Sequence, residues 1–424
     1  MNTEERIKAC HSLITEEAVK EALKAHKGGE ARLTSWQIKD FTSKGDNYAS
    51  VVSSVELDFD LNGNDESITY IVKINPCHGM ESFEEMTHTI FLKEAEFYIK
   101  LLPQLNGVLR EHELSPLAVP ECHYGTLEKK RELIFLEDLR PRGFKMFDRR
   151  KGLDVAHASL VLKELARLHA ASLLLQKKDP EYSKDTLLHR GWINMTDDGF
   201  GMLQVLEGVM DTGIMMLKKV GGYESSITWA ESTKSKLREI FEKQREPCKH
   251  QVICHGDAWN NNLLFKYDED GVPVEVMLID LQMCRREPFA VDLNYLLYTS
   301  LTGDVRKPNL DALLETYRGH FNGVMETEGE GRLLEGEVLQ EFRRLNILGA
   351  IFNMMIICPI LMEPEDVPDF EMSGDDAADM ERVIAELRAR SLEMVDTNPL
   401  MRPRFLSVFD ELMETGLIPA SGAP

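Results

Sequence analysis

The sequence lacks the features that mark several common classes of protein. Its seven cysteines are dispersed and include no Cys-x-x-Cys pair, so neither a disulfide framework nor a structural zinc site is expected. Positive charge is in deficit: 49 Lys and Arg against 72 Asp and Glu give a formal net charge of −23, which argues against nucleic acid or an anionic membrane as a partner. The charged N-terminal segment does not contain the apolar core of a signal peptide. Together these absences predict a cytoplasmic protein.

The order of sequence patterns predicts two unlike lobes. With 424 residues, the chain is too long for one small core. Alternating strand patterns fill the first third, together with a helix predicted over about residues 84–102 that stops at Pro103, and helical patterns dominate the remainder. The most apolar stretch, Asn346–Met362, is short for a membrane span and is predicted to be a buried helix. We therefore predict an α+β fold with a small β-rich lobe (residues 1–138) and a larger, mostly helical lobe (residues 139–424).

A dense polar segment, HGDAWNNNLLF at residues 255–265, lies between two apolar runs. If the second run and VEVMLID form a hairpin, Asp280 returns to the end of the hairpin that carries Asp257 and Asn262. Carboxylate and amide oxygens are the ligands that Mg²⁺ prefers, and Asp257 then remains to accept a proton or to orient a hydroxyl. A polar turn followed by a strand-end Asp is the alternative interpretation. The return of Asp280 favours a phosphoryl-transfer site.

A phosphoryl-transfer site also requires a cation for the phosphates and a carboxylate to hold that cation. Lys73 ends a predicted strand, where an ordinary solvated lysine is the alternative. In the predicted helix, Glu94 has apolar neighbours at helical spacing, whereas Glu96 has lysines and is expected on the surface. Because an unpaired buried carboxylate is costly, we expect Lys73 to face Glu94.

The segment between the first two strands is the candidate phosphate loop. It contains only one glycine and no G-x-G-x-x-G pattern, so an ordinary hairpin loop is the alternative. Its position before the Lys73 strand favours the phosphate loop, with the candidate residues Gly45, Asp46, Asn47 and Tyr48.

The segments GDNYAS, YIVK, FLKEAEFY, FLEDL, HGDAWNNNLL and LIDLQ occur in this order. The sequence thereby resembles the aminoglycoside-phosphotransferase and choline-kinase branch of the protein-kinase-like fold, and within it most closely the ecdysteroid-kinase-like family. The resemblance covers roughly residues 36–300. It implies ATP- and Mg²⁺-dependent phosphorylation of a hydroxyl group on a small molecule.

The resemblance also implies a role for each matching residue. Asp257 would be the catalytic base, and Asn262 and Asp280 would hold the metal. Lys73, paired with Glu94, would contact the phosphates of ATP. The segment at residues 135–139 would be the hinge between the lobes, where the backbone of Glu137 and Leu139 would form hydrogen bonds with adenine.

The residues after Asp280 restrict the class of acceptor. No Asp-Phe-Gly or Ala-Pro-Glu motif is present, so a protein substrate is not expected. Met-rich helical segments favour a lipophilic alcohol, although ordinary core methionines are the alternative. The resemblance points to an ecdysteroid as the acceptor. The alternative functions are a detoxification kinase that acts on xenobiotic alcohols and a catalytically inactive nucleotide-binding protein. His169 is predicted to be a satisfied core residue, His255 a structural support of the loop, and Asp292 a helix cap that the resemblance would also make a brace for the catalytic loop.

Overall fold

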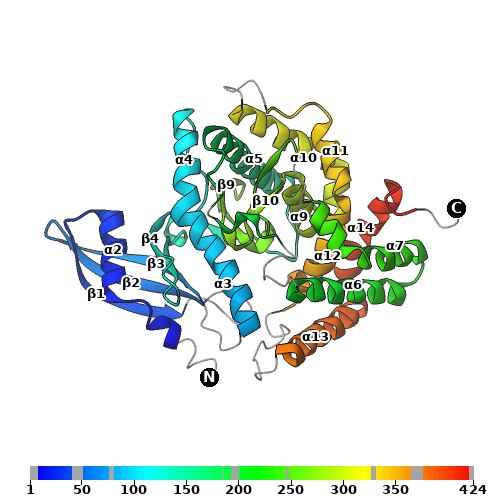
Figure 1. Cartoon of the computed structure of the whole chain (residues 1–424), viewed down its shortest axis with the longest axis horizontal. Helices are drawn as coiled ribbons and strands as arrows, with labels where there is room; N and C mark the ends of the chain where they lie inside the picture. The colour runs from blue at the N-terminus through cyan, green and yellow to red at the C-terminus, as the bar shows by residue number, and fades with distance from the viewer. Residues whose placement is uncertain are drawn as a thin grey trace.

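The computed structural model describes residues 8–40, 51–75, 81–184, 186–191, 200–244, 248–325, 331–363 and 376–419. A lobe built around one sheet occupies one end of the molecule, and a larger group of helices occupies the other (Figure 1). The predicted α+β class with two unlike lobes is confirmed. The boundary at residue 138 stays a prediction, although the last strand of the N-terminal sheet ends at Glu137.

The N-terminal sheet is antiparallel, with the strand order β1-β2-β3-β5-β4. The turn between β2 and β3 contains Asn62 at φ 55° and Gly63 at φ 84°. Positive φ at both positions is the geometry that Asn-Gly provides in a two-residue hairpin, so the local sequence explains this turn. The strands are β1 (Ala31–Asp40), β2 (Val51–Leu61), β3 (Asn64–Ile74), β4 (Cys122–Thr126) and β5 (Leu133–Glu137).

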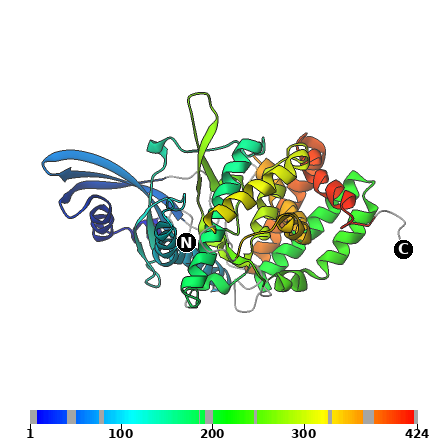
Figure 2. The same cartoon turned by 90° about the horizontal axis from the view of Figure 1, so that it is seen from above.

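Helices cover both faces of this sheet. Helix α2 (Glu16–Lys27) is capped by the side chain of Thr15 and packs its apolar residues against one face, where Val55, Leu57 and Tyr70 are buried. Helix α3 (Glu81–Glu96) lies on the other side, between the sheet and the helical lobe (Figures 1 and 2). The second face of the sheet therefore looks toward the junction of the two lobes.

The predicted end of the α3 helix at Pro103 is wrong. The chain continues through a π-helical turn, η1 (Phe97–Leu101), into α4 (Leu102–Glu111), and Pro103 lies in the first turn of α4. The π-helical turn separates α3 from α4, so α4 begins as a new helical segment. A proline in a first turn removes no required hydrogen bond, because those N–H groups have no partner within the helix.

The C-terminal lobe is mostly helical, and two small sheets carry its polar loops. A three-stranded sheet has the order β6-β8-β9, and β10 pairs with β7. The strands are β6 (Lys145–Met146), β7 (Gln251–Cys254), β8 (Leu263–Tyr267), β9 (Pro273–Leu278) and β10 (Arg285–Pro288). The helices are α5 (Val155–Lys178), α6 (Phe200–Val220), α7 (Glu224–Lys234), α8 (Leu237–Lys243), α9 (Ala290–Ser300), α10 (Gly303–Val324), α11 (Glu337–Arg344), α12 (Asn346–Leu361), α13 (Asp376–Thr397) and α14 (Met401–Glu414), with short 3-10 turns at η2 (Arg140–Arg142), η3 (Leu187–His189), η5 (Asn260–Asn262) and η6 (Leu281–Met283).

Helices α9 and α12 form the centre of this lobe. Every residue of α9 is buried, and α12 is the buried helix predicted for the most apolar segment. Within the described ranges no single helix is long and apolar enough to cross a membrane, although α11 and α12, bent by 56°, meet that test together on length and composition alone.

Candidate active site

The polar segment at residues 255–262 lies at one end of a hairpin, as predicted. Strand β8 pairs with β9 in a register that places Leu263 opposite Leu278, and the N–H of Ile279 donates to the carbonyl of Asn262 at 3.0 Å. This register returns Asp280 to the loop that carries Asp257. The backbone of Asp280 is left-handed, with φ 64°, an uncommon conformation for a residue other than glycine.

The Asp257 carboxylate is held at both oxygens. The hydroxyl of Tyr295 donates to Oδ1, and Nδ2 of Asn262 donates to Oδ2 at 2.9 Å. The same Asn262 amide also donates to the backbone carbonyl of Asp257 at 2.9 Å, which leaves its Oδ1 as an acceptor. Burial raises the pKa of Asp257 to about 7 and outweighs the lowering by Tyr295. A carboxylate with such a pKa can accept a proton near neutral pH.

Lys73 contacts two carboxylates that come from opposite sides of the lobe junction. Its Nζ lies 2.8 Å from Oε1 of Glu94 and 2.6 Å from Oδ1 of Asp280. The predicted contact with Glu94 is therefore present, and the contact with Asp280 joins β3 to the end of the β8-β9 hairpin. Burial alone would lower the pKa of Lys73, but Asp280 and Glu94 outweigh it and hold that pKa above its usual value. Burial raises the pKa of Glu94, against the effect of Lys73.

Two further residues of α3 reach into the C-terminal lobe, and sequence reasoning missed both. Glu96, expected on the surface, is 9% exposed and accepts the backbone N–H of Leu187 at 2.8 Å. Lys93 is 1% exposed, and its Nζ donates to the carbonyl of Arg190 at 2.6 Å. Burial lowers the pKa of Lys93 to about 7. These contacts hold α3, and with it Glu94, against the helical lobe.

Asp292 braces the loop at residues 255–262 rather than capping its own helix. Its carboxylate accepts the backbone N–H of His255 at 2.7 Å and that of Gly256 at 2.9 Å. His169 contacts the same carboxylate at 3.0 Å and the hydroxyl of Tyr317 at 2.8 Å, so it is the satisfied core residue predicted. The ring of His255 contacts the carbonyl of Ile279 at 3.1 Å and ties the loop to the hairpin, in agreement with its predicted structural role.

Tyr295 was not predicted as a site residue, although helical spacing provides a signal for it. It comes three residues after Asp292 on α9, and residues at that spacing share one face of a helix. A face that braces the loop at Asp292 therefore also meets the loop one turn later, where Asp257 lies.

The predicted hinge segment, residues 135–139, contains the two residues whose backbone is expected to hydrogen-bond adenine. The N–H of Glu137 donates to the carbonyl of Glu121 at 2.8 Å and is engaged. Among the described residues, none accepts a hydrogen bond from the N–H of Leu139. Leu139 is buried in an apolar cluster with Phe144 and Met277, to which Ala118, Leu264 and Ile279 add partly buried side chains. The adenine-binding role of Glu137 and Leu139 stays a prediction. The phosphate loop with Gly45, Asp46, Asn47 and Tyr48 also stays a prediction, because it lies outside the described residues.

The donor atoms around Asp280 fit a hard divalent cation. Asp280 provides carboxylate oxygens, and Asn262 keeps its carbonyl oxygen because its nitrogen is committed to Asp257. Oδ2 of Asp280 also accepts a hydrogen bond from the amide of Gln282 at 3.0 Å. Oδ1 accepts one from the ammonium group of Lys73, so this carboxylate already stabilises a positive charge. Oxygen-only donors of this kind suit Mg²⁺.

Comparisons with known proteins agree with the family resemblance of the sequence. The profile of the ecdysteroid kinase-like family matches residues 44–328. No curated protein matched the chain.

Several solved structures are similar to the chain. An ethanolamine kinase of Plasmodium vivax shares 12% identity, with a TM-score of 0.38 and coverage of 94% of this chain and 97% of that one. A choline kinase of Cryptosporidium parvum shares 12% identity, with a TM-score of 0.42 and coverage of 96% and 100%. An aminoglycoside 2'-phosphotransferase-IIIa in its GDP complex shares 12% identity, with a TM-score of 0.37 and coverage of 88% and 99%. Because the family profile matches more than half of the chain, the protein belongs to the ecdysteroid kinase-like family, with its two-lobed kinase-like fold.

Proposed function

We propose that the protein is an ATP-dependent phosphotransferase that phosphorylates a hydroxyl group of a lipophilic small molecule, with an ecdysteroid as the first candidate. The observation that carries the proposal is the meeting of Asp257, Asn262 and Asp280 at one hairpin end, with Lys73 bound to both Asp280 and Glu94. Phosphoryl transfer depends mainly on positioning and on charge stabilisation, and this cluster has groups for both.

In the proposed reaction, Asp257 accepts the proton of the acceptor hydroxyl. The acceptor oxygen forms a bond to the γ-phosphorus, and the bond from that phosphorus to the bridging oxygen of ADP breaks. Tyr295 and Asn262 fix the Asp257 carboxylate for this task. Lys73 stabilises negative charge on the phosphates, and Glu94 holds Lys73 in place. Mg²⁺, held by Asn262 and Asp280, would neutralise phosphate charge when bound.

We propose that the nucleotide base lies between apolar side chains of the two lobes. Ile71 lies two residues before Lys73 on β3 and so faces the same side of the sheet. Leu264 and Ile279 lie on the C-terminal side, next to the buried Leu139. Adenine between these apolar groups would accept a hydrogen bond from the N–H of Leu139.

A screen for ADP release tests this function. The protein would be incubated with Mg-ATP and, separately, an ecdysteroid, choline, an aminoglycoside or a phenolic alcohol. We expect acceptor-dependent ADP release that Asp257→Asn abolishes. Turnover only with phenolic alcohols would favour a detoxifying kinase, and ATP binding with no turnover on any alcohol would favour the inactive nucleotide-binding protein.

A further inference from the structure

Arg285 is a buried cation beside the loop that carries Asp257. It is 1% exposed and begins β10, whose register places it opposite Cys254 of β7, the residue before the loop. Its Nε lies 2.9 Å from Oε2 of Glu287, which is also buried. A buried ion pair contributes little net stability, so the pair alone does not account for an arginine at this position.

The guanidinium of Arg285 contacts both segments that carry the candidate site. Its Nη1 donates to the carbonyl of Gly256 at 3.2 Å and to the carbonyl of Met283 at 2.9 Å. Gly256 immediately precedes Asp257, and Met283 comes three residues after Asp280. One nitrogen of Arg285 thus joins the segment of the candidate base to the segment of the candidate metal ligand.

The peptide group between Gly256 and Asp257 is held at both of its polar atoms. Arg285 donates to its carbonyl oxygen, and its N–H donates to Nδ1 of His255 at 3.3 Å. Burial lowers the pKa of His255, and the neutral ring can accept at Nδ1 while Nε2 donates to the carbonyl of Ile279. Among the described residues no backbone N–H donates to the Gly256 carbonyl, so the hydrogen bond from Arg285 fixes the orientation of this peptide plane.

Position 256 leaves room for Arg285 because it is a glycine. Gly256 has φ 82°, a left-handed conformation that other residues rarely adopt. A Cβ atom at this position would also clash with the carbonyl oxygen of Met283 and with Nη1 of Arg285. The backbone of the loop therefore approaches the guanidinium more closely than a residue with a side chain would permit.

We propose that Arg285 is a positioning residue of the candidate active site, which orients the peptide group that carries Asp257 and ties it to the segment of Asp280. The assignment rests on the proposed phosphotransferase function and adds a residue to its machinery. Tyr295 and Asn262 hold the carboxylate end of Asp257, and Arg285 holds the backbone end. Because transfer depends on placing the base against the acceptor hydroxyl, a displacement of about 1 Å can lower the rate about a hundredfold.

Arg285→Lys tests this role and keeps a positive charge opposite Glu287. An ammonium group lacks the planar fork of a guanidinium, so it cannot reproduce the contacts of Arg285 together. Kinetics would be measured by ADP release, and calorimetry with ATP would count the nucleotide-binding sites. We expect kcat per site to fall about tenfold or more, while the ATP dissociation constant stays unchanged because Lys73 and Asp280 are intact. Hydrogen exchange of the backbone amides at residues 255–258 should become faster.

Two further variants separate this role from folding. Arg285→Met combined with Glu287→Gln removes the contacts without leaving an unpaired buried charge, and it should lower kcat further than Arg285→Lys. Arg286→Lys is the matched control, because Arg286 is the next residue of β10 and points to the opposite face, where it donates to Oγ of Ser183 at 3.3 Å. This control should change neither kcat nor the exchange at residues 255–258.

Unchanged kcat or unchanged exchange at residues 255–258 in Arg285→Lys would overturn the proposal. So would an ATP dissociation constant that rises as much as kcat falls, or an equal loss of kcat in Arg286→Lys. Faster exchange in Arg285→Lys, together with no phosphate transfer by the unmodified protein, would reject the phosphotransferase function and keep Arg285 as the support of the loop.

Discussion

The hydrogen bond from Tyr295 to Asp257 gives a quantitative prediction for the candidate base. Tyr295→Phe removes one hydroxyl and keeps the ring, which packs against Phe352 with ring centroids 4.6 Å apart. A hydrogen bond to a charged acceptor contributes about 1.5–3 kcal/mol. Because this bond favours the ionised carboxylate, its loss should raise the pKa of Asp257 by about 1–2 units, at about 1.36 kcal/mol per unit.

The expected consequence is a shift of the pH profile. Asp257 must be ionised to accept a proton, so activity should rise as pH increases through its pKa of about 7. In Tyr295→Phe the acid limb of kcat/KM for the acceptor should move upward by about 1–2 pH units. At pH 7 the activity of the variant should be about five- to fiftyfold lower than that of the unmodified protein, and much of that loss should be recovered at alkaline pH.

Tyr298→Phe is the control for this experiment. Tyr298 lies on the same helix and is also buried, but its ring stacks on Phe342 rather than reaching Asp257. Kinetics from pH 6 to about pH 9.5, measured by ADP release, would compare both variants with the unmodified protein. An acid limb that stays in place in Tyr295→Phe, or moves equally in Tyr298→Phe, would refute the reasoning.

The same geometry supports three further predictions. Asp280→Asn should weaken metal-dependent nucleotide binding, whereas Asp257→Asn should lower kcat with ATP affinity nearly intact; equal loss of ATP binding in both would show that the roles are wrong. The pKa of Asp257, raised from 3.8 to about 7, means that the folded state holds a proton that the unfolded state has lost, so stability falls as pH rises through that window. As pH rises from 4 to 7, the free energy of unfolding of Asp257→Asn should therefore increase relative to that of the unmodified protein, by on the order of 4 kcal/mol at most. Urea unfolding curves that show the same difference between the two proteins at every pH would contradict this. Glu96→Ala should cost about 1–3 kcal/mol of stability by leaving the N–H of Leu187 without a partner, and it should raise the KM for ATP more than it lowers kcat; an unchanged KM would exclude a positioning role for Glu96.

The parts of the site that the sequence predicted are those governed by local periodicity. Helical spacing identified Glu94 as a core-facing carboxylate that meets Lys73, and strand pairing returned Asp280 to the loop of Asp257. In both cases the side-chain direction depends on the period of one element and on the type of one turn.

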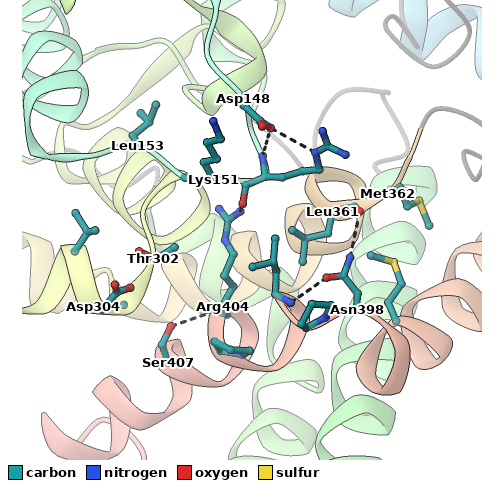
Figure 3. A pocket seen from close by; sticks show the side chains of 18 of the residues that line it. Asp148, Lys151, Leu153, Thr302, Asp304, Leu361, Met362, Asn398, Arg404 and Ser407 are labelled. Carbon is teal, nitrogen blue, oxygen red and sulfur yellow. Dashed lines mark hydrogen bonds and ion pairs between the residues drawn. The ribbon is translucent and has the colours of Figure 1, made fainter. Parts of the chain in front are cut away.

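The features that were missed depend on contacts between distant segments. Glu96 was expected on the surface because its helical neighbours are lysines, but the loop that holds Leu187 covers it in the folded chain. A cavity in the helical lobe (Figure 3) is formed by segments more than 250 residues apart, from Asp148 to Ser407, and no local pattern connects them. Pro103 was expected to stop the helix, whereas the π-helical turn before it lets the chain begin a new helical segment.

Direct detection of the phosphorylated product is the most decisive measurement for the proposed function. The protein would be incubated with Mg²⁺ and ATP labelled in its γ-phosphate, together with an ecdysteroid, and the products would be identified by mass spectrometry. We predict an ecdysteroid carrying one labelled phosphate, formed by the unmodified protein and absent with Asp257→Asn. Binding of ATP without a labelled product on the ecdysteroid or on any other alcohol would contradict the account.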